Sequence, residues 1–291
     1  MHSDSGLVVV DKPAGWTSHD VVARVRRLAG TKKVGHAGTL DPMATGVLVL
    51  GIGRATRLLG HLQLADKEYE ATIRLGESTV TDDAEGEIVA RVDASHLTDG
   101  AIRDAMLPLT GLIQQVPTAV SAIKVEGKRA YARVRAGEDI QLSARPVTVS
   151  DFEARDLRRL GPVIDVDVHV ACSTGTYVRA LARDLGAALA VGGHLTMLRR
   201  TRVGGFTVAD AKTLEQLEST FATVPLADAA RATFPTLELD EPTAQAVRHG
   251  RKLTGLDLGS PGVVALFSPD GAFIALYEQK DDTARPVAVF V

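Results

Sequence analysis

The stretch GHAGTLDPMATG, Gly35–Gly46, combines turn-forming residues with two side chains that can do chemistry. Asp41 precedes Pro42, which restrains it to an extended or turn conformation. A carboxylate held in this way can act as a nucleophile or as a base. Asp before Pro is about as typical of an ordinary turn, so Asp41 alone leaves both interpretations open. A lone histidine is more often structural, and His36 gains interest only because it shares this stretch with Asp41.

A second candidate lies in GTYVRALARDLG, Gly175–Gly186, where Tyr177 and Arg179 stand at the expected start of a helix. Helix N-termini favour anions, and an arginine there can bind a carboxylate or a phosphate. A surface salt bridge explains Arg179 equally well when the stretch is taken alone.

Two further stretches carry partial motifs. VLVLGIGRAT, Val47–Thr56, has the strand and Gly-x-Gly of a dinucleotide-binding turn, but Thr56 occupies the third glycine position. We therefore interpret Gly51 and Gly53 as a tight turn. TDDAEGE, Thr81–Glu87, lacks the ligand spacing of a calcium loop and is expected to be a solvated hairpin turn.

The elements that must position these residues follow from hydrophobic periodicity and capping signals. Ser18 is expected to cap a helix that runs through Leu28 and ends at Gly30. Strands are expected at Gly6–Val10, Val47–Leu50, Glu68–Leu75, Ile88–Val92, Val163–Ala171 and Leu195–Phe206. Further helices are expected at Arg54–Leu64, Thr98–Leu107, Thr176–Ala190, Leu214–Glu218 and Leu226–Ala230.

Two segments differ from the rest of the chain in composition or in the spacing of their expected elements. Gln115–Arg145 is basic, is expected to project from the body, and is predicted to carry a helix near Ala130–Ala136. Phe234–Val291 has short strands at regular spacing around one helix near Thr243–His249, which predicts a small separate β module.

Composition limits the class of protein. The chain has 291 residues, 45% of them apolar, and no apolar run of membrane-spanning length. The N-terminus lacks the features of a secretory signal, and Cys172 is the only cysteine, so no internal disulfide can form. We therefore expect a cytoplasmic protein without a metal cluster.

The net charge of −3 hides three basic stretches. Lys and Arg outnumber Asp and Glu by 8 to 4 in residues 1–64, by 6 to 3 in 111–145 and by 5 to 1 in 171–205. Binding to a phosphate backbone depends on local rather than total charge. Charge alone nevertheless fits solvated surfaces just as well.

Taken together and in order, several motifs closely resemble those of the bacterial TruB family, tRNA pseudouridine synthases that modify uridine 55 of the T-loop. They are Asp11-Lys12-Pro13, Gly35–Gly46, Lys67-Glu68-Tyr69, Ser121–Lys124, Gly175–Arg179 and Leu198-Arg199-Arg200. The resemblance covers Gly6 to Phe206, and the C-terminal module is similar in position and texture to the PUA-type domain of the family. One departure is Val120, where many relatives have an aromatic residue.

The resemblance implies roles for individual residues. Asp41 takes the position of the catalytic aspartate, Arg179 that of its partner, and Tyr69 that of the tyrosine stacked on the target base. His36 matches the residue that displaces the flipped base. Tyr177, Leu198 and Lys12 match pocket residues. The residues expected to bind RNA are Lys124, Lys128, Arg129, Arg133, Arg199, Arg200 and Arg202.

The resemblance also implies an α+β fold, with a mixed, largely antiparallel central sheet and a PUA-like domain. We expect a catalytic domain at residues 1–230, with a thumb-like insertion at about 115–145, and the PUA-like domain at 231–291. The implied partner is the T-arm of tRNA, acted on by a monomer without cofactor or metal. The small residues around Asp41 are expected to let a flipped nucleotide approach the backbone.

Two other functions remain open at this level. An RNA-binding folding helper would use the same basic surface but would not require Asp41. A nucleotide-dependent oxidoreductase would use Val47–Thr56 and would bind a cofactor.

Overall fold

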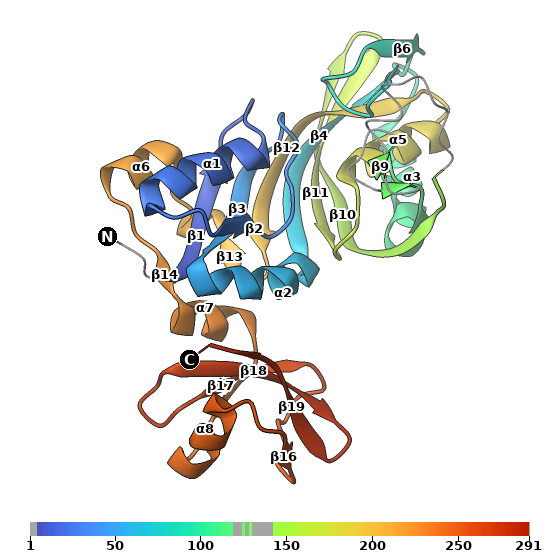
Figure 1. Ribbon diagram of the computed structural model, residues 1–291. Coiled ribbons are helices and arrows are strands. Elements are labelled where there is room, and N and C mark those ends of the chain that lie inside the picture. Colours follow the sequence, from blue (N-terminus) through green and yellow to red (C-terminus); the bar gives the residue numbers. More distant parts are fainter. Residues whose placement is uncertain (1–4, 119–123, 126–127, 130–141, 291) are drawn as a thin grey trace.

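The structure is a computed structural model that describes residues 5–118, 124–125, 128–129 and 142–290. Ten strands form one mixed sheet, whose main order is β14-β1-β3-β12-β4-β11-β10-β7 (Figure 1). Its strands are β1 Gly6–Lys12, β2 Val34–His36, β3 Thr45–Ile52, β4 Lys67–Leu75, β7 Gly111–Gln115, β10 Arg145–Leu160, β11 Val163–Cys172, β12 Gly193–Val203, β13 Phe206–Thr207 and β14 Val224–Pro225. The short strands β2 and β13 pair with β3 and β12. This arrangement confirms the α+β class.

Helices and two small hairpins complete this part of the chain. The helices are α1 Ser18–Ala29, η1 Gly53–Leu58, α2 Leu59–Leu64, α3 Asp99–Met106, η2 Leu107–Leu109, α5 Val178–Ala188, η3 Val208–Asp210, α6 Leu214–Ser219 and α7 Leu226–Thr233. The hairpins are β5 Glu77–Thr79 with β6 Ile88–Arg91, and β8 Lys124–Val125 with β9 Lys128–Arg129. Among the helices of the described ranges, none has the length and apolar character needed to cross a membrane.

The centre of the sheet is the place where β3 and β12 run parallel, whereas the other pairings within this sheet are antiparallel. Gly46 of β3 lies opposite Arg200 of β12. It has a φ of +95°, and a Cβ there would lie 2.2 Å from the carbonyl oxygen of Arg200. Gly46 is therefore required by the approach of two strands, which differs from the expected reason of access for a nucleotide.

The alternation predicted for β4 is confirmed. Tyr69, Ala71, Ile73 and Leu75 are buried on one face of the strand. They belong to a large apolar core that also takes in side chains of α1, α3 and α5, such as Val21, Ile102 and Leu181. These three helices therefore cover one face of the sheet.

The other face of β1 and β3 packs against a different set of elements. Leu7 and Val49 join Leu58 and Leu62 of the η1–α2 segment, together with α7 and the C-terminal strands. The expected single helix over Arg54–Leu64 is thus a 3-10 turn followed by α2. Gly53 has a φ of +59°, which confirms the expected turn at that residue, whereas Gly51 lies within β3 opposite Leu7.

Helix α1 begins differently from the prediction. Its N-cap is Thr17, whose side chain accepts a hydrogen bond from the Asp20 backbone and completes a capping box. Ser18 is inside the helix and 1% exposed, so the prediction that Ser18 caps the helix was wrong by one residue. Gly30 ends the helix in the left-handed conformation, as expected.

The C-terminal part forms a second sheet with the order β15-β17-β18-β19-β16. Its elements are β15 Thr236–Glu238, α8 Glu241–Arg248, β16 Leu253–Thr254, β17 Val263–Phe267, β18 Phe273–Lys280 and β19 Thr283–Val289. It lies beyond α7 in Figure 1, and Arg54 of η1 donates to the carbonyl oxygen of Phe290. Helix α7 runs across residue 230, the expected domain boundary.

Candidate active site

A cleft of about 330 Å³ opens where the β2–β3 loop meets β4, β12 and the start of α5. Its lining residues are Gly38, Thr39, Leu40, Asp41, Gln63, Lys67, Tyr69, Thr174, Gly175, Thr176, Tyr177, Val178, Arg179, Leu198 and Arg200. Segments more than a hundred residues apart in sequence thus contribute to one small cavity with both polar and apolar walls.

Asp41 lies in the irregular loop between β2 and β3. Its carbonyl oxygen accepts a hydrogen bond from the Ala44 backbone, which closes a tight turn over Pro42 and Met43. The side chain is 38% exposed, and its Oδ2 lies 3.1 Å from Nε of Arg179. The carboxylate therefore lines the cleft while one of its oxygens is held by a cation.

Arg179 is itself held by a second carboxylate. It lies in the first turn of α5 and is 7% exposed. Its Nη1 donates to Asp83 Oδ2 at 3.1 Å and to the carbonyl oxygen of Thr81 at 2.9 Å. One guanidinium thus joins Asp41 to the segment between β5 and β6.

The hairpin turn expected at Thr81–Glu87 is present between β5 and β6, but one of its residues, Asp83, is buried instead of solvated. Asp83 is 2% exposed, and its Oδ1 accepts hydrogen bonds from the hydroxyl of Thr81 and the backbone of Glu85. A buried carboxylate with these partners and an arginine is fully engaged, as burial of a charge requires. The acidic stretch was the only signal in the sequence, and its contact with Arg179 spans 96 residues.

Opposing effects act on the ionisation of Asp41. Burial raises the pKa of its carboxyl above the ordinary value, and the nearby charge of Asp83 adds to this increase. Arg179 and Lys12 lower the pKa. Arg179 thus acts in the direction expected from the sequence, but burial has the larger effect.

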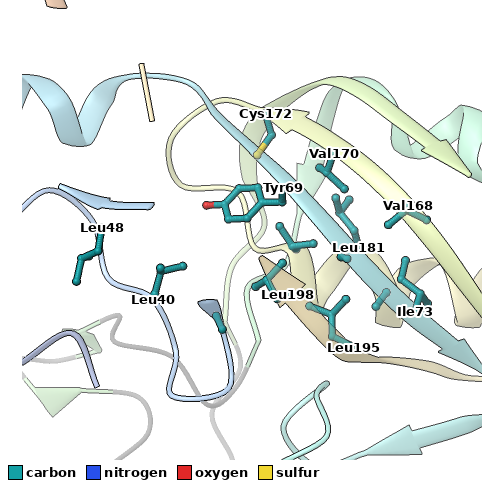
Figure 2. Packing of buried hydrophobic residues seen from close by; sticks show 14 of the residues in the cluster. Leu40, Leu48, Tyr69, Ile73, Val168, Val170, Cys172, Leu181, Leu195 and Leu198 are labelled. Atoms are coloured by element: carbon teal, nitrogen blue, oxygen red, sulfur yellow. The ribbon is translucent and has the colours of Figure 1, made fainter. Parts of the chain in front are cut away.

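Tyr69 forms one wall of the cleft. It is 7% exposed and lies opposite Arg200 in the pairing of β4 with β12. In Figure 2 its hydroxyl points toward the side where the Leu40 loop lies, with Leu198 nearby. Burial raises the pKa of this phenol above its ordinary value, so the hydroxyl is neutral at neutral pH and can donate a hydrogen bond.

Lys12 has no exposed surface, and its Nζ donates to the carbonyl oxygens of Pro13, Trp16 and Pro42. Burial lowers the pKa of Lys12 to about 8. Its partners place it beneath the loop that carries Asp41, where it supports that loop, and it is not among the residues that line the cleft.

Arg200 is also internal. It is 1% exposed, and its guanidinium donates to the carbonyl oxygens of Val47, Thr39 and Gly38. Arg200 lines the cleft but offers almost no exposed surface, so its expected contact with RNA stays a prediction. Three hydrogen bonds to the β2–β3 loop and to β3 make it a support of that loop.

Comparison with known proteins decides the family. Residues 26–178 match the model of the TruB family pseudouridylate synthase N-terminal domain. Residues 179–234 match the tRNA pseudouridylate synthase B C-terminal domain, and residues 234–291 match the C-terminal model of tRNA pseudouridine synthase II. The chain belongs to the TruB family.

Curated TruB relatives match over almost their whole length. A tRNA pseudouridine synthase B of Thermobifida fusca is 58% identical, with 98% of each chain covered. One from Arthrobacter sp. is 59% identical, with 98% of this chain and 96% of the relative covered.

Solved structures agree with this fold. A Cbf5-Nop10-Gar1 complex contains a chain that is 28% identical, with a TM-score of 0.75 and coverage of 100% of this chain and 85% of that one. An H/ACA RNP bound to a substrate RNA containing 2′-deoxyuridine gives 26% identity and a TM-score of 0.74, with 100% and 86% covered.

The remaining residues taken from the TruB pattern are spread over several places. Tyr177 and Leu198 line the cleft with Asp41, whereas His36 lies at the end of β2 with its ring 5.7 Å from that of His19. Burial lowers the pKa of His36, which favours a neutral ring.

The predicted RNA-binding residues other than Arg200 fall into three groups. Arg199 and Arg202 are partly exposed on β12 and pair with Asp11 and Glu68. Lys124, Lys128 and Arg129 lie on the hairpin of β8 and β9, where Lys124 pairs with Arg129 in register. Arg133, Val120 and the predicted helix over Ala130–Ala136 lie outside the described residues.

One residue that supports the cleft from outside its lining could not have been identified from the sequence. Gln115, at the end of β7, is 2% exposed. Its side-chain amide donates to the carbonyl oxygen of Tyr177 and accepts from the Tyr177 backbone NH. It therefore holds the residue that precedes α5, two positions before Arg179.

Proposed function

We propose that this chain is a tRNA pseudouridine synthase that isomerises uridine 55 in the T-loop of tRNA by base flipping and aspartate-dependent catalysis. The observation that carries the proposal is the carboxylate of Asp41, which lines a cleft beside Tyr69 while Arg179 binds one of its oxygens. The names of the curated relatives support the reaction and the class of substrate.

The cleft suits a single flipped nucleotide. At about 330 Å³ it is at the small end of ligand sites and has no room for a duplex. An extruded base is read by stacking and by contacts with its edges. We assign the stacking surface to Tyr69 and the apolar wall to Leu198, with Tyr177 lining the same pocket. His36 is assigned to filling the space that the flipped base leaves.

The reaction is an isomerisation within one nucleotide. The bond between C1′ and N1 breaks, the uracil turns, C5 bonds to C1′, and the proton on C5 is lost while N1 gains one. Atoms and electrons balance without an oxidant, a reductant or a group donor. We assign to Asp41 the covalent or basic step, which requires its ionised form, and to Arg179 the orientation and charge of that carboxylate.

The proposed function also assigns roles to the RNA-binding elements and to the two parts of the chain. The T-arm is held by the partly exposed arginines of β12 and by the basic insertion at about 115–145. Residues 1–230 form the catalytic part and 231–291 a PUA-like RNA-binding part. The enzyme acts as a monomer in the cytoplasm and needs no cofactor.

Tritium release from tRNA that carries [5-³H]uridine tests the reaction directly. The wild-type chain is expected to release tritium from one uridine per tRNA, and tRNA with cytidine at position 55 is expected to release none. Asp41→Asn should abolish release while the Kd for tRNA, measured by filter binding, changes little. Release by Asp41→Asn at a rate near that of the wild type would show that Asp41 has been wrongly assigned.

The same assay separates the proposal from an RNA folding helper. A helper would rescue misfolded tRNA without releasing tritium, and its effect would persist in Asp41→Asn. Absence of tritium release from the wild-type chain on full-length tRNA would therefore overturn the proposed function.

A further inference from the structure

The backbone beside Asp41 is held by a buried serine from another element. Ser18, at the start of α1, is 1% exposed. Its Oγ accepts a hydrogen bond from the Leu40 backbone NH at 2.9 Å and donates one to the Leu40 carbonyl oxygen at 3.0 Å. Both polar groups of the residue before Asp41 are thus bound by one side chain.

The residue after Asp41 is held from the same segment. The carbonyl oxygen of Pro42 accepts hydrogen bonds from the Gly15 backbone at 2.8 Å and from Nζ of Lys12 at 3.2 Å. Leu40 and Pro42 are therefore both fixed by the stretch that runs from the end of β1 into α1. Asp41 lies between these two fixed points.

This fixation matters because the loop has no sheet pairing of its own. Strand β2 ends at His36 and β3 begins at Thr45, so the position of the residues around Asp41 depends on turns and on hydrogen bonds from other segments. The carboxylate of Asp41 reaches into the cleft from this loop. Displacement of a reacting group by about 1 Å can lower a rate by about 10²-fold.

We propose that Ser18 is a positioning residue for the reaction, because its paired hydrogen bonds to Leu40 set the place of the Asp41 carboxylate relative to Arg179 and the bound base. This inference rests on the proposed function and adds a residue that does not touch the substrate. A capping role does not account for these contacts, since Thr17 caps α1.

Ser18→Ala tests the inference in full-length protein with tRNA carrying [5-³H]uridine. The single-turnover rate at saturating enzyme is expected to fall by about 10-fold to 10²-fold. The Kd for tRNA should stay within about twofold, because no residue that could contact RNA has changed. Ser18→Cys, which keeps a similar volume and a weak thiol donor, should give an intermediate rate, and it carries the test if Ser18→Ala does not fold.

Two control variants separate positioning from general stability. Thr17→Ala removes the cap of the same helix but leaves the Leu40 contacts in place. Ser268→Ala removes a serine that is also 1% exposed and makes two hydrogen bonds, at the far end of β17. Both should lower the melting temperature and leave the single-turnover rate within about twofold of the wild type.

The outcomes distinguish the two levels of the proposal. An unchanged rate in Ser18→Ala, or a loss in Thr17→Ala as large as that in Ser18→Ala, would overturn the positioning role alone. A wild-type chain that releases no tritium would overturn the proposed function and this inference with it.

Discussion

Asp83 and Arg179 form an ion pair that is almost completely enclosed, with 3.1 Å between Asp83 Oδ2 and Nη1 and with side chains that are 3% and 8% exposed. Asp41, which binds Nε of the same guanidinium, is 38% exposed. The inner carboxylate therefore determines where the arginine lies, and the outer one is left to face the cleft.

Replacing Asp83 by asparagine should damage both stability and turnover. Loss of one partner of a buried pair leaves part of the arginine charge uncompensated, which costs about 3 kcal/mol of unfolding free energy. We expect the tritium-release rate to fall by more than tenfold, because Arg179 loses the buried charge that helps to fix its position, while the Kd for tRNA changes little. Chemical denaturation and single-turnover assays measure the two effects.

The neighbouring Asp82→Asn is the matched control for Asp83→Asn. Asp82 is 3.5 Å from Arg183, and its side chain is 16% exposed. Because burial raises the pKa of Asp82 above its ordinary value, removal of its charge should cost little stability and leave the rate unchanged. Equal effects of the two variants would show that the enclosed pair has no special role.

The pKa of Asp41 predicts a pH dependence of opposite sign for rate and stability. Because burial raises this pKa in the folded protein, the carboxylate is lost as the pH falls through that raised value, and the rate should fall with it. Between the ordinary and the raised pKa, the Asp41 carboxyl is protonated to a greater extent in the folded protein than in the unfolded one. The stability that this group contributes therefore decreases as the pH rises through that window.

Asp41→Asn removes the contribution of Asp41 ionisation to stability, so comparison with the wild type shows whether that contribution is favourable or unfavourable. The melting temperature of the variant should match that of the wild type below the ordinary pKa of 3.8 and exceed it at neutral pH. Melting curves of both proteins across this range provide the measurement. A variant that is less stable than the wild type at neutral pH would mean that the Arg179 pair outweighs burial.

Gln115→Leu should disturb the cleft by loosening the backbone of Tyr177, one of its lining residues. The change removes both hydrogen bonds between the side-chain amide and the Tyr177 backbone, at a cost of about 1–3 kcal/mol in unfolding free energy. Since α5 begins directly after Tyr177, the rate should fall more than the affinity for tRNA. Gln114→Leu, on the exposed side of the same strand, should alter stability by no more than about 0.5 kcal/mol.

The burial of Arg200 predicts a difference between two arginines of one strand. Arg200→Met should lower stability without changing the slope of log Kd for tRNA against log salt concentration. Arg202→Met should reduce that slope by about one, as expected for the loss of a phosphate contact. A reduced slope for Arg200→Met would show that this residue does contact RNA, as first expected.

Secondary structure and burial could be predicted from the sequence where a single local pattern determines them. Alternation over β4 identified Tyr69 and its buried neighbours, and the left-handed Gly30 ended α1 where the pattern placed it. The motif around Asp41, together with the TruB resemblance, predicted the pair with Arg179 across more than a hundred residues.

Other features depend on tertiary contacts that a pattern does not encode. Arg200 and Arg202 look alike in the sequence, but only the packing of β12 against β3 and β4 buries Arg200. Asp83 sits in a polar turn that resembles any solvated hairpin until α5 folds onto it. Ser18 and Thr17 are both good capping residues, and the position of Leu40 decides which of them is drawn inside.

The junction between the two sheets has a consequence for biosynthesis. The apolar cluster beneath β1 and β3 takes in Leu7 and Val49 from the start of the chain and Phe273 and Phe290 from its last strands. The ribosome synthesises Leu7 and Val49 well before Phe273 and Phe290. This face of the catalytic sheet therefore lacks part of its cover until β18 and β19 have been synthesised, and during that time it is exposed to chaperones and proteases.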